Sequence, residues 1–235
     1  MNIKGIHIDN IDLYKEYKIL PESRSIGNPD KKKILEEIPF SNKVLDFSEL
    51  YGEQTYSERT ISYVLNLIGT QSTEQSAYFL QTVMTNLLMD KQQFRLYDDI
   101  FPNYYFLAEV RGGTSFAENS YAGKLQVDFI CYPFKIKTAK EGSQLWDDYS
   151  ILDYYQETSF SVNGTKTIKL MNNGISSVIP KVTASSSMVV TKENTTITFP
   201  IGTNESYDLV IDKGMNYLTI TGNGTIDFEF HKEMI

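Results

Sequence analysis

The sequence predicts a mainly β protein with one helix, built as an α+β first domain followed by an all-β second domain. Three observations predict this: one helical stripe of apolar residues in the first half, runs in which apolar and polar residues alternate, and short strand-like runs at roughly ten-residue spacing in the second half. The chain has 235 residues, of which 41% are hydrophobic and 22% charged. This composition is typical of globular proteins, and the length allows two domains to bury a core each.

The first half combines one helix with several strands. A helix that Ser72 or Thr73 can cap is predicted by apolar residues at helical spacing, namely Leu80, Val83, Met84, Leu87 and Leu88. β-branched and aromatic side chains are frequent in residues 59–67, 94–97 and 104–108, and residues 125–131 alternate between apolar and polar. Such runs are typical of half-buried strands. We therefore expect a sheet against which the helix packs.

The second half is expected to be entirely β. Asn163-Gly164 lies between two strand-like runs, and Asn-Gly in that position is the strongest short signal of a hairpin. Gly222-Asn223-Gly224 is expected to form another turn, before a last strand at residues 226–230 that alternates cleanly. Several short strands separated by such turns predict a β-sandwich or jelly roll.

The boundary between the domains is predicted at a stretch of small and polar residues, Thr138 to Ser143. This gives a first domain of residues 1–138 and a second domain of residues 139–235. Four aromatic residues gather near the boundary: Trp146, Tyr149, Tyr154 and Tyr155. The favoured interpretation is that they pack at the junction of the domains, and the alternative is that they stack on a sugar.

Charge and composition exclude several classes of function. The chain has 30 acidic and 22 basic side chains, a net charge of −8, which makes it a poor partner for nucleic acid. Its one cysteine, Cys131, excludes a disulfide framework within the chain. No apolar run is long enough to cross a bilayer, and the first residues do not have the pattern of a signal peptide. We expect no membrane association.

Catalytic motifs are missing from the sequence. It contains no phosphate-binding loop, zinc-protease motif, nucleophile elbow or Cys-x-x-Cys pair, and only two histidines, His7 and His231. The adjacent carboxylates Asp98-Asp99 and Asp147-Asp148 are expected to be solvated or to cap turns, because neighbours in a strand point to opposite faces. We therefore expect a protein without enzymatic activity, cofactor or metal.

The order of several short motifs resembles the distal tail proteins of long, flexible-tailed bacteriophages that infect Gram-positive bacteria. The motifs are Ile38-Pro39, Leu45-Asp46, Tyr56-Ser57-Glu58-Arg59, the helix ending near Asp90, Leu96-Tyr97-Asp98-Asp99, Pro133-Phe134-Lys135, Asn172-Asn173-Gly174 and Gly214-Met215-Asn216 with the strand that follows. One departure is clear. The family often has glycines after its Ile-Pro, where this chain has Phe40-Ser41-Asn42, so the conformation of that loop is not predicted by the resemblance.

The resemblance implies a structural virion protein at the distal end of the phage tail, assembled in the host cytoplasm. The first domain would be a β-sandwich with a helix and a hairpin that closes six copies into a ring, as one ring or as two rings back to back. The second domain would be a galectin-like β-sandwich. The ring would join the tail-tube protein to the tail-tip protein, serve as a hub for receptor-binding or baseplate proteins, and let DNA pass without binding it.

A closed ring requires that one patch of each copy meets a different patch on the next copy. The segment Pro21 to Tyr51 is our candidate for such a patch, because proline, glycine and charge interrupt it and it shows little periodicity.

Two alternatives stay open. In the first alternative, the chain is a carbohydrate-binding, lectin-like tail protein, and its second domain contacts the host cell wall. A galactose site of the galectin type is not expected, since residues 139–235 contain no arginine and His231 is their only histidine. In the other alternative, two Asp or Glu side chains from distant parts of the chain form a hydrolase site.

Overall fold

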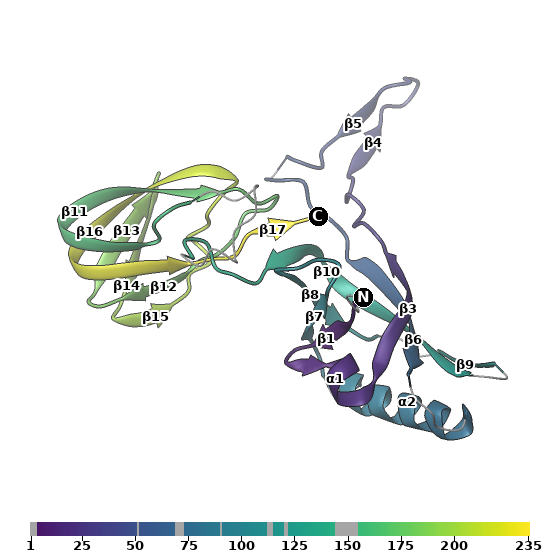
Figure 1. The fold of residues 1–235 in the computed structure, drawn as a ribbon. Coiled ribbons are helices and arrows are strands. Elements are labelled where there is room, and N and C mark those ends of the chain that lie inside the picture. Colours follow the sequence, from purple (N-terminus) through teal and green to yellow (C-terminus); the bar gives the residue numbers. More distant parts are fainter. Residues whose placement is uncertain are drawn as a thin grey trace. The chain divides into compact units, whose positions relative to one another are not determined.

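The computed structural model describes residues 4–50, 52–68, 73–89, 91–111, 115–119, 122–143 and 155–235. The chain divides into two compact units, residues 1–135 with residue 235, and residues 136–234. The fold is mainly β, as the sequence predicts, and both helices of the described residues belong to the first unit (Figure 1). Among the described residues, no helix has the length and apolar character needed to span a bilayer.

The first unit is built on one large sheet. Its strands follow the order β2 (Ile11–Asp12), β1 (Ile6–Ile8), β7 (Phe94–Asp98), β8 (Tyr104–Glu109), β10 (Ala122–Lys137), β6 (Arg59–Leu67) and β3 (Ile19–Ile26), and β9 (Ser115–Asn119) also pairs with β10. The expected alternation is visible in the central pair, where Tyr63 of β6 lies opposite Val127 of β10 and both are fully buried. The predicted strands at 59–67, 94–97, 104–108 and 125–131 are therefore confirmed.

The predicted helix is also confirmed. It is α2 (Thr73–Leu88), and its buried residues Leu80, Met84 and Leu88 join the same core as the sheet. Burial of each such side chain contributes about 1.5–3 kcal/mol, which explains why the helix forms here. Ser72, one of the two predicted caps, lies outside the described residues.

A second, short helix was not predicted. It is α1 (Leu13–Tyr17), and it begins where the Asp12 carboxylate accepts hydrogen bonds from the backbone N–H groups of Tyr14 and Lys15, at 3.0 and 3.1 Å. Lys18 ends it in a left-handed conformation. Five residues are too few to show helical periodicity, so only the capping residue was available as a signal.

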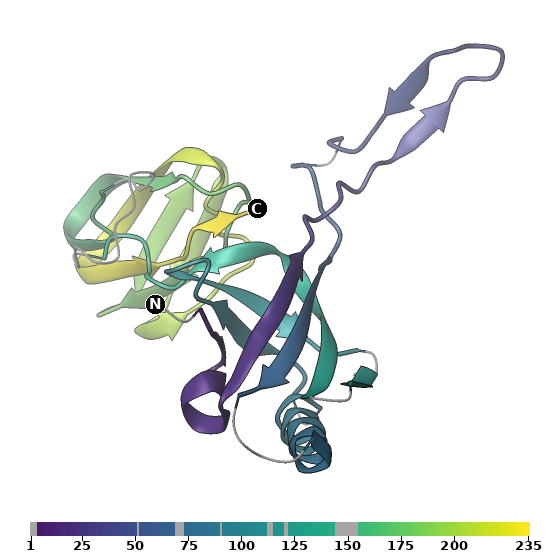
Figure 2. The ribbon, with the colours of Figure 1, turned by 45° about the vertical axis from the view of Figure 1, so that its right-hand side comes forward.

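A two-stranded hairpin, which we call the arm, leaves the first unit between β3 and β6. It comprises β4 (Leu35–Glu37) and β5 (Val44–Asp46), paired antiparallel with Glu36 opposite Leu45. A bridge between Lys31 and Tyr56 closes its base, and we define the arm as residues 31–56. Figure 2 shows the arm extending away from the sheet of its own unit.

The second unit is one curled sheet. Its strands follow the order β14 (Thr195–Phe199), β13 (Met188–Lys192), β16 (Gly214–Glu229), β12 (Lys181–Ala184) and β15 (Gly202–Asn204), with β11 (Ser159–Asn172) paired along β16. A short strand β17 (Glu233–Met234) follows. The concave side holds a separate apolar core that includes Val190, Leu218, Ile220 and Phe228.

The predicted hairpin at Asn163-Gly164 and the predicted turn at Gly222 to Gly224 are both wrong. β11 and β16 are continuous strands, and these two segments lie opposite each other, with Asn163 paired to Asn223 and Gly164 to Gly222. Gly164, Gly222 and Gly224 have φ of 85°, 151° and 139°, a region that glycine adopts without steric cost. The Asn223 side-chain oxygen accepts a hydrogen bond from the Gly164 N–H at 2.9 Å. Glycines here bend two paired strands together instead of reversing the chain.

Candidate assembly surface

The arm carries a concentrated set of exposed apolar side chains. They are Ile34, Leu35, Ile38, Phe40, Val44, Leu45, Phe47 and Leu50. A two-stranded hairpin has two faces, and neither face of this one is buried on the rest of the described chain. Exposed apolar surface of this extent is typical of a protein-interaction site.

The arm is nevertheless ordered by its own hydrogen bonds. The Phe47 N–H donates to the Ile34 carbonyl at 2.8 Å, and the Ile34 N–H donates to the Ser48 hydroxyl oxygen at 2.9 Å. Lys33 forms an ion pair with Asp46 at 2.7 Å. The hydrogen bonds from Lys33 and from Ser48 hold the pKa of Asp46 well below its ordinary value. These contacts hold the two strands together while the apolar side chains stay exposed.

The tip of the arm has a strained aromatic residue. The Ser41 N–H donates to the Ile38 carbonyl at 3.0 Å, which closes a turn with Pro39 and Phe40 at its centre. Phe40 has a φ of 62° and is fully exposed. Glycine is the usual residue at such a position, and a bulky side chain there costs about 1–3 kcal/mol. Phe40 stands in the loop after Ile38-Pro39, where the resembled family often has glycines, and its ring is exposed.

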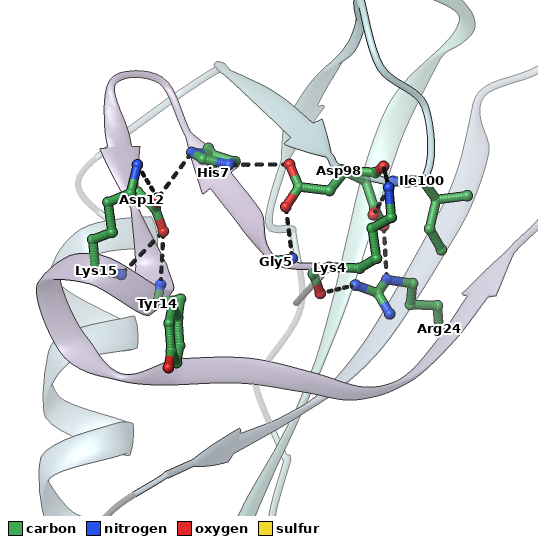
Figure 3. A network of polar contacts seen from close by, with 10 residues as sticks. Lys4, Gly5, His7, Asp12, Tyr14, Lys15, Arg24, Asp98 and Ile100 are labelled. Carbon is green, nitrogen blue, oxygen red and sulfur yellow. Dashed lines mark hydrogen bonds and ion pairs between the residues drawn. The ribbon is translucent and has the colours of Figure 1, made fainter. Parts of the chain in front are cut away.

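A network of polar contacts near the N-terminus of the first unit surrounds the adjacent carboxylates Asp98 and Asp99 (Figure 3). The Asp98 side chain is fully buried, and its carboxylate accepts hydrogen bonds from Tyr63 at 2.8 Å, from Arg24 at 3.0 Å and from the Ile100 N–H at 3.0 Å. Burial, with the neighbouring Asp98 charge, raises the pKa of Tyr63. Asp98 thus joins β7 to β6 and β3.

The neighbouring carboxylate, Asp99, contacts the N-terminal strand β1 and the residue before it. Asp99 accepts a hydrogen bond from the Gly5 N–H at 2.8 Å, and its second oxygen lies 3.3 Å from His7 Nε2. Asp12 lies 3.9 Å from the other ring nitrogen of His7. The expectation that Asp98 and Asp99 are solvated or cap turns holds only in part, because Asp98 caps a turn but is buried. Asp147-Asp148 lie outside the described residues.

The predicted aromatic cluster is only partly visible. Trp146, Tyr149 and Tyr154 lie outside the described residues, and Tyr155 is 61% exposed. Their role in domain packing or sugar binding remains a prediction. Within the described ranges, His, Cys, Asp and Glu side chains form no group of three that could hold a metal ion.

Sequence reasoning located the segment of the candidate surface but missed its structure. Pro21 to Tyr51 was identified by its lack of periodicity, while the signal for the arm was the density of apolar residues between Ile34 and Leu50. Proline and charges interrupt these residues, so they match neither the helical period nor strict alternation.

The described residues define a two-unit, mainly β fold with an exposed apolar arm on the first unit. No family model and no curated protein matches the sequence. Among solved structures, the chain matches SPP1 Dit (gp 19.1), described as a paradigm of the hub adsorption apparatus in phages that infect Gram-positive bacteria, over 100% of both chains with a TM-score of 0.66 and 11% sequence identity. The two proteins therefore share a fold over their whole length.

Two structures of the phage p2 baseplate in its activated conformation match more weakly. The structure with Sr has 11% identity over 99% of this chain and 98% of that chain, and the structure with Ca has 14% identity over 100% and 99%, each with a TM-score of 0.46.

Proposed function

We propose that this protein is a structural virion protein, a distal tail hub of a long, flexible-tailed bacteriophage. The observation that carries the proposal is the exposed arm with Phe40 at its tip, on a fold shared over the whole chain with SPP1 Dit. Within the described part of the chain, the eight exposed apolar residues between Ile34 and Leu50 belong to neither apolar core, so the cores of the two units do not account for them. A hub that joins copies of itself requires such a surface.

We assign the arm to contact with a neighbouring copy in a ring of six, as one ring or two rings back to back. In a ring, one patch of each copy meets a different patch on the next. Burial of one leucine or phenylalanine contributes about 1.5–3 kcal/mol before ordering costs. Several arm residues buried at each contact are therefore enough to offset the loss of rotational and translational freedom, estimated at about 4–15 kcal/mol.

The proposed domains divide the work. Residues 1–138 form the ring, and residues 139–235 serve as the platform for other tail proteins, with their curled sheet interpreted as a galectin-like fold. The partners are the tail-tube protein, the tail-tip protein and receptor-binding or baseplate proteins. The location is the distal end of the tail, with assembly in the host cytoplasm. The net charge of −8 suits a channel that lets DNA pass without retaining it, and the function requires no catalysis.

Light scattering after gel filtration, with negative-stain images of the peak, tests the proposal. We expect a mass of six or twelve chains and ring-shaped particles. Leu45→Asp places a charge in the arm and should give monomers, while Tyr207→Asp, at an exposed aromatic of the second unit, should leave the rings intact. A wild-type chain that stays monomeric at high concentration, or rings that persist in Leu45→Asp, would refute the proposed assembly.

A further inference from the structure

On the outer face of the sheet in the second unit, one patch across four strands is made almost entirely of threonine. On β16, Leu218 and Ile220 are buried, so Thr219 and Thr221 point to the opposite, outer face. The same alternation holds in the strands beside it. The outer positions of four adjacent strands form what we call the threonine face: Thr165 and Thr167 of β11, Thr219 and Thr221 of β16, Val189 and Thr191 of β13, and Thr196 and Thr198 of β14.

The register arranges these residues in two straight rows across the strands. The first row is Thr165, Thr221, Val189 and Thr198, and the second is Thr167, Thr219, Thr191 and Thr196. Neighbouring strands lie about 4.8 Å apart, and alternate residues along a strand about 6.7 Å apart. The result is a two-dimensional lattice of hydroxyl and methyl groups without a charged side chain inside it.

The hydroxyl groups keep unused hydrogen-bonding capacity. Three pairs lie within hydrogen-bond distance: Thr165 with Thr221 at 3.4 Å, Thr167 with Thr219 at 3.3 Å, and Thr191 with Thr196 at 3.1 Å. Each hydroxyl has one proton and two lone pairs, so a pair that shares one proton still has a second proton and further lone pairs to offer. The face can therefore both donate and accept at regular intervals.

An aromatic ring borders the lattice. Tyr217 precedes Thr219 on the same face of β16 and is 57% exposed, and Lys169 of β11 lies opposite it with its ammonium 5.4 Å from the ring centre. Met215 and Met171 form the next pair. Tyr217 thus offers an amphipathic ring at the edge of a hydroxyl surface.

This chemistry favours one kind of partner. The eight positions of the lattice carry no charge with which to hold an anionic polymer, and the Lys169 ammonium at its border lies over the Tyr217 ring. Threonine is also under-represented among the residues that dominate protein interfaces. A neutral polysaccharide complements it, because sugar hydroxyls both donate and accept hydrogen bonds and the apolar face of a sugar ring can stack on Tyr217. We propose that the threonine face and Tyr217 bind a neutral polysaccharide. This activity goes beyond the hub function and uses only the second unit.

Affinity electrophoresis of the full chain in gels containing a soluble neutral glucan or N-acetylglucosamine polymer tests the proposal, with a polyanionic polysaccharide as the comparison. We expect the neutral polymers to retard the wild type. The double variant Thr167→Val/Thr219→Val keeps the branched shape but removes the hydroxyls of one central pair, and it should weaken binding about tenfold, equivalent to about 1.4 kcal/mol. Tyr217→Ala should weaken binding at least as much.

A matched control exists on the same unit. Thr183 and Thr203 form a hydroxyl pair at 2.9 Å that lies outside the threonine face, and Thr183→Val/Thr203→Val should bind within twofold of the wild type. Thermal melting checks that each variant is folded, and Val substitutions are expected to be tolerated because valine favours strands. The proposal is refuted if no neutral polymer retards the wild type, if the polyanion alone does so, or if the face variants bind like the control.

Discussion

The arm and the paired strands β11 and β16 are both antiparallel ribbons, yet they use apolar residues differently. In β11 and β16, apolar side chains such as Ile168 and Leu218 lie on one face and are buried in the core of the second unit. In the arm, Leu35, Val44 and Leu45 are exposed. The core of the chain explains why β11 and β16 carry apolar residues. It does not explain the apolar residues of the arm. The packed sheets are explained by their own core, and the exposed residues of the arm are what the proposed contact with a neighbouring copy would bury.

The largest effect is expected in the packed sheet of the first unit. Asp98→Ala leaves Arg24 and Tyr63 without their buried acceptor, and loss of one partner of a buried pair costs about 3–5 kcal/mol. Urea unfolding, monitored by circular dichroism, should show that the first unit unfolds at a lower urea concentration in the variant than in the wild type. A midpoint equal to that of the wild type would mean that the network does not hold the unit together.

A second test compares one leucine from each ribbon. Leu218→Ala opens a cavity in the core of the second unit and should cost about 2–5 kcal/mol. Leu45→Ala removes the same atoms from the exposed arm and should change the stability of the monomer by less than about 0.5 kcal/mol. Unfolding is measured at a dilution where the chain is monomeric. Equal costs would show that the arm is packed on its own chain, contrary to the comparison.

The substitution Phe40→Gly distinguishes the backbone strain at this position from the contribution of the Phe40 side chain to the proposed interface. Glycine suits the positive φ at this position, so the monomer should be no less stable than the wild type. The ring should dissociate at higher protein concentration, because each contact loses up to about 1.5–3 kcal/mol of apolar burial. Sedimentation across a dilution series measures this. Rings as stable as those of the wild type would remove Phe40 from the interface.

The smallest effect is expected in the arm alone, whose local stability should fall at acidic pH. The pKa of Asp46 is lowered by Lys33 and Ser48, so the folded arm prefers the ionised carboxylate. The contribution of this group is present above its ordinary pKa of 3.8 and is lost as the pH falls below that value. The protection of the Phe47 N–H against hydrogen exchange, corrected for the pH dependence of the intrinsic rate, should fall on acidification relative to that of amides in β6. In Asp46→Asn the same amide should be faster already at neutral pH.

Much of the fold was predictable because local pattern and tertiary packing agree there. The helix around Leu80 and Met84 and the alternating strand through Val127 both show the period of their element, and each buries the face that the pattern indicates. The wrong predictions lie where one local sequence signal is compatible with two structures. Asn163-Gly164 permits a tight turn or a bend in a long strand, and only its pairing with Gly222, some sixty residues away, decides between them.

The candidate surface was predictable as a segment but not as a structure. Nothing in residues 34–50 shows that they pair with each other, since Pro39 and the charges interrupt any period. Their exposure also depends on the absence of contacts with the rest of the chain, which a local pattern cannot show. The threonine face was not predictable from the sequence for a similar reason. Its two rows form only because four strands pair in a particular register, which a local pattern does not show.

The free arm also makes the unassembled chain vulnerable to aggregation. A short ribbon with open edges and apolar side chains is the kind of segment that pairs with copies of itself into disordered deposits. Glu36, Glu37 and Lys43 place charges on or beside its strands, and Pro39 stands in the turn between them. Charges and proline are features that natural proteins use to prevent such pairing. If the arm is buried only in an assembled ring, as proposed, these four residues would oppose self-pairing of the arm before assembly.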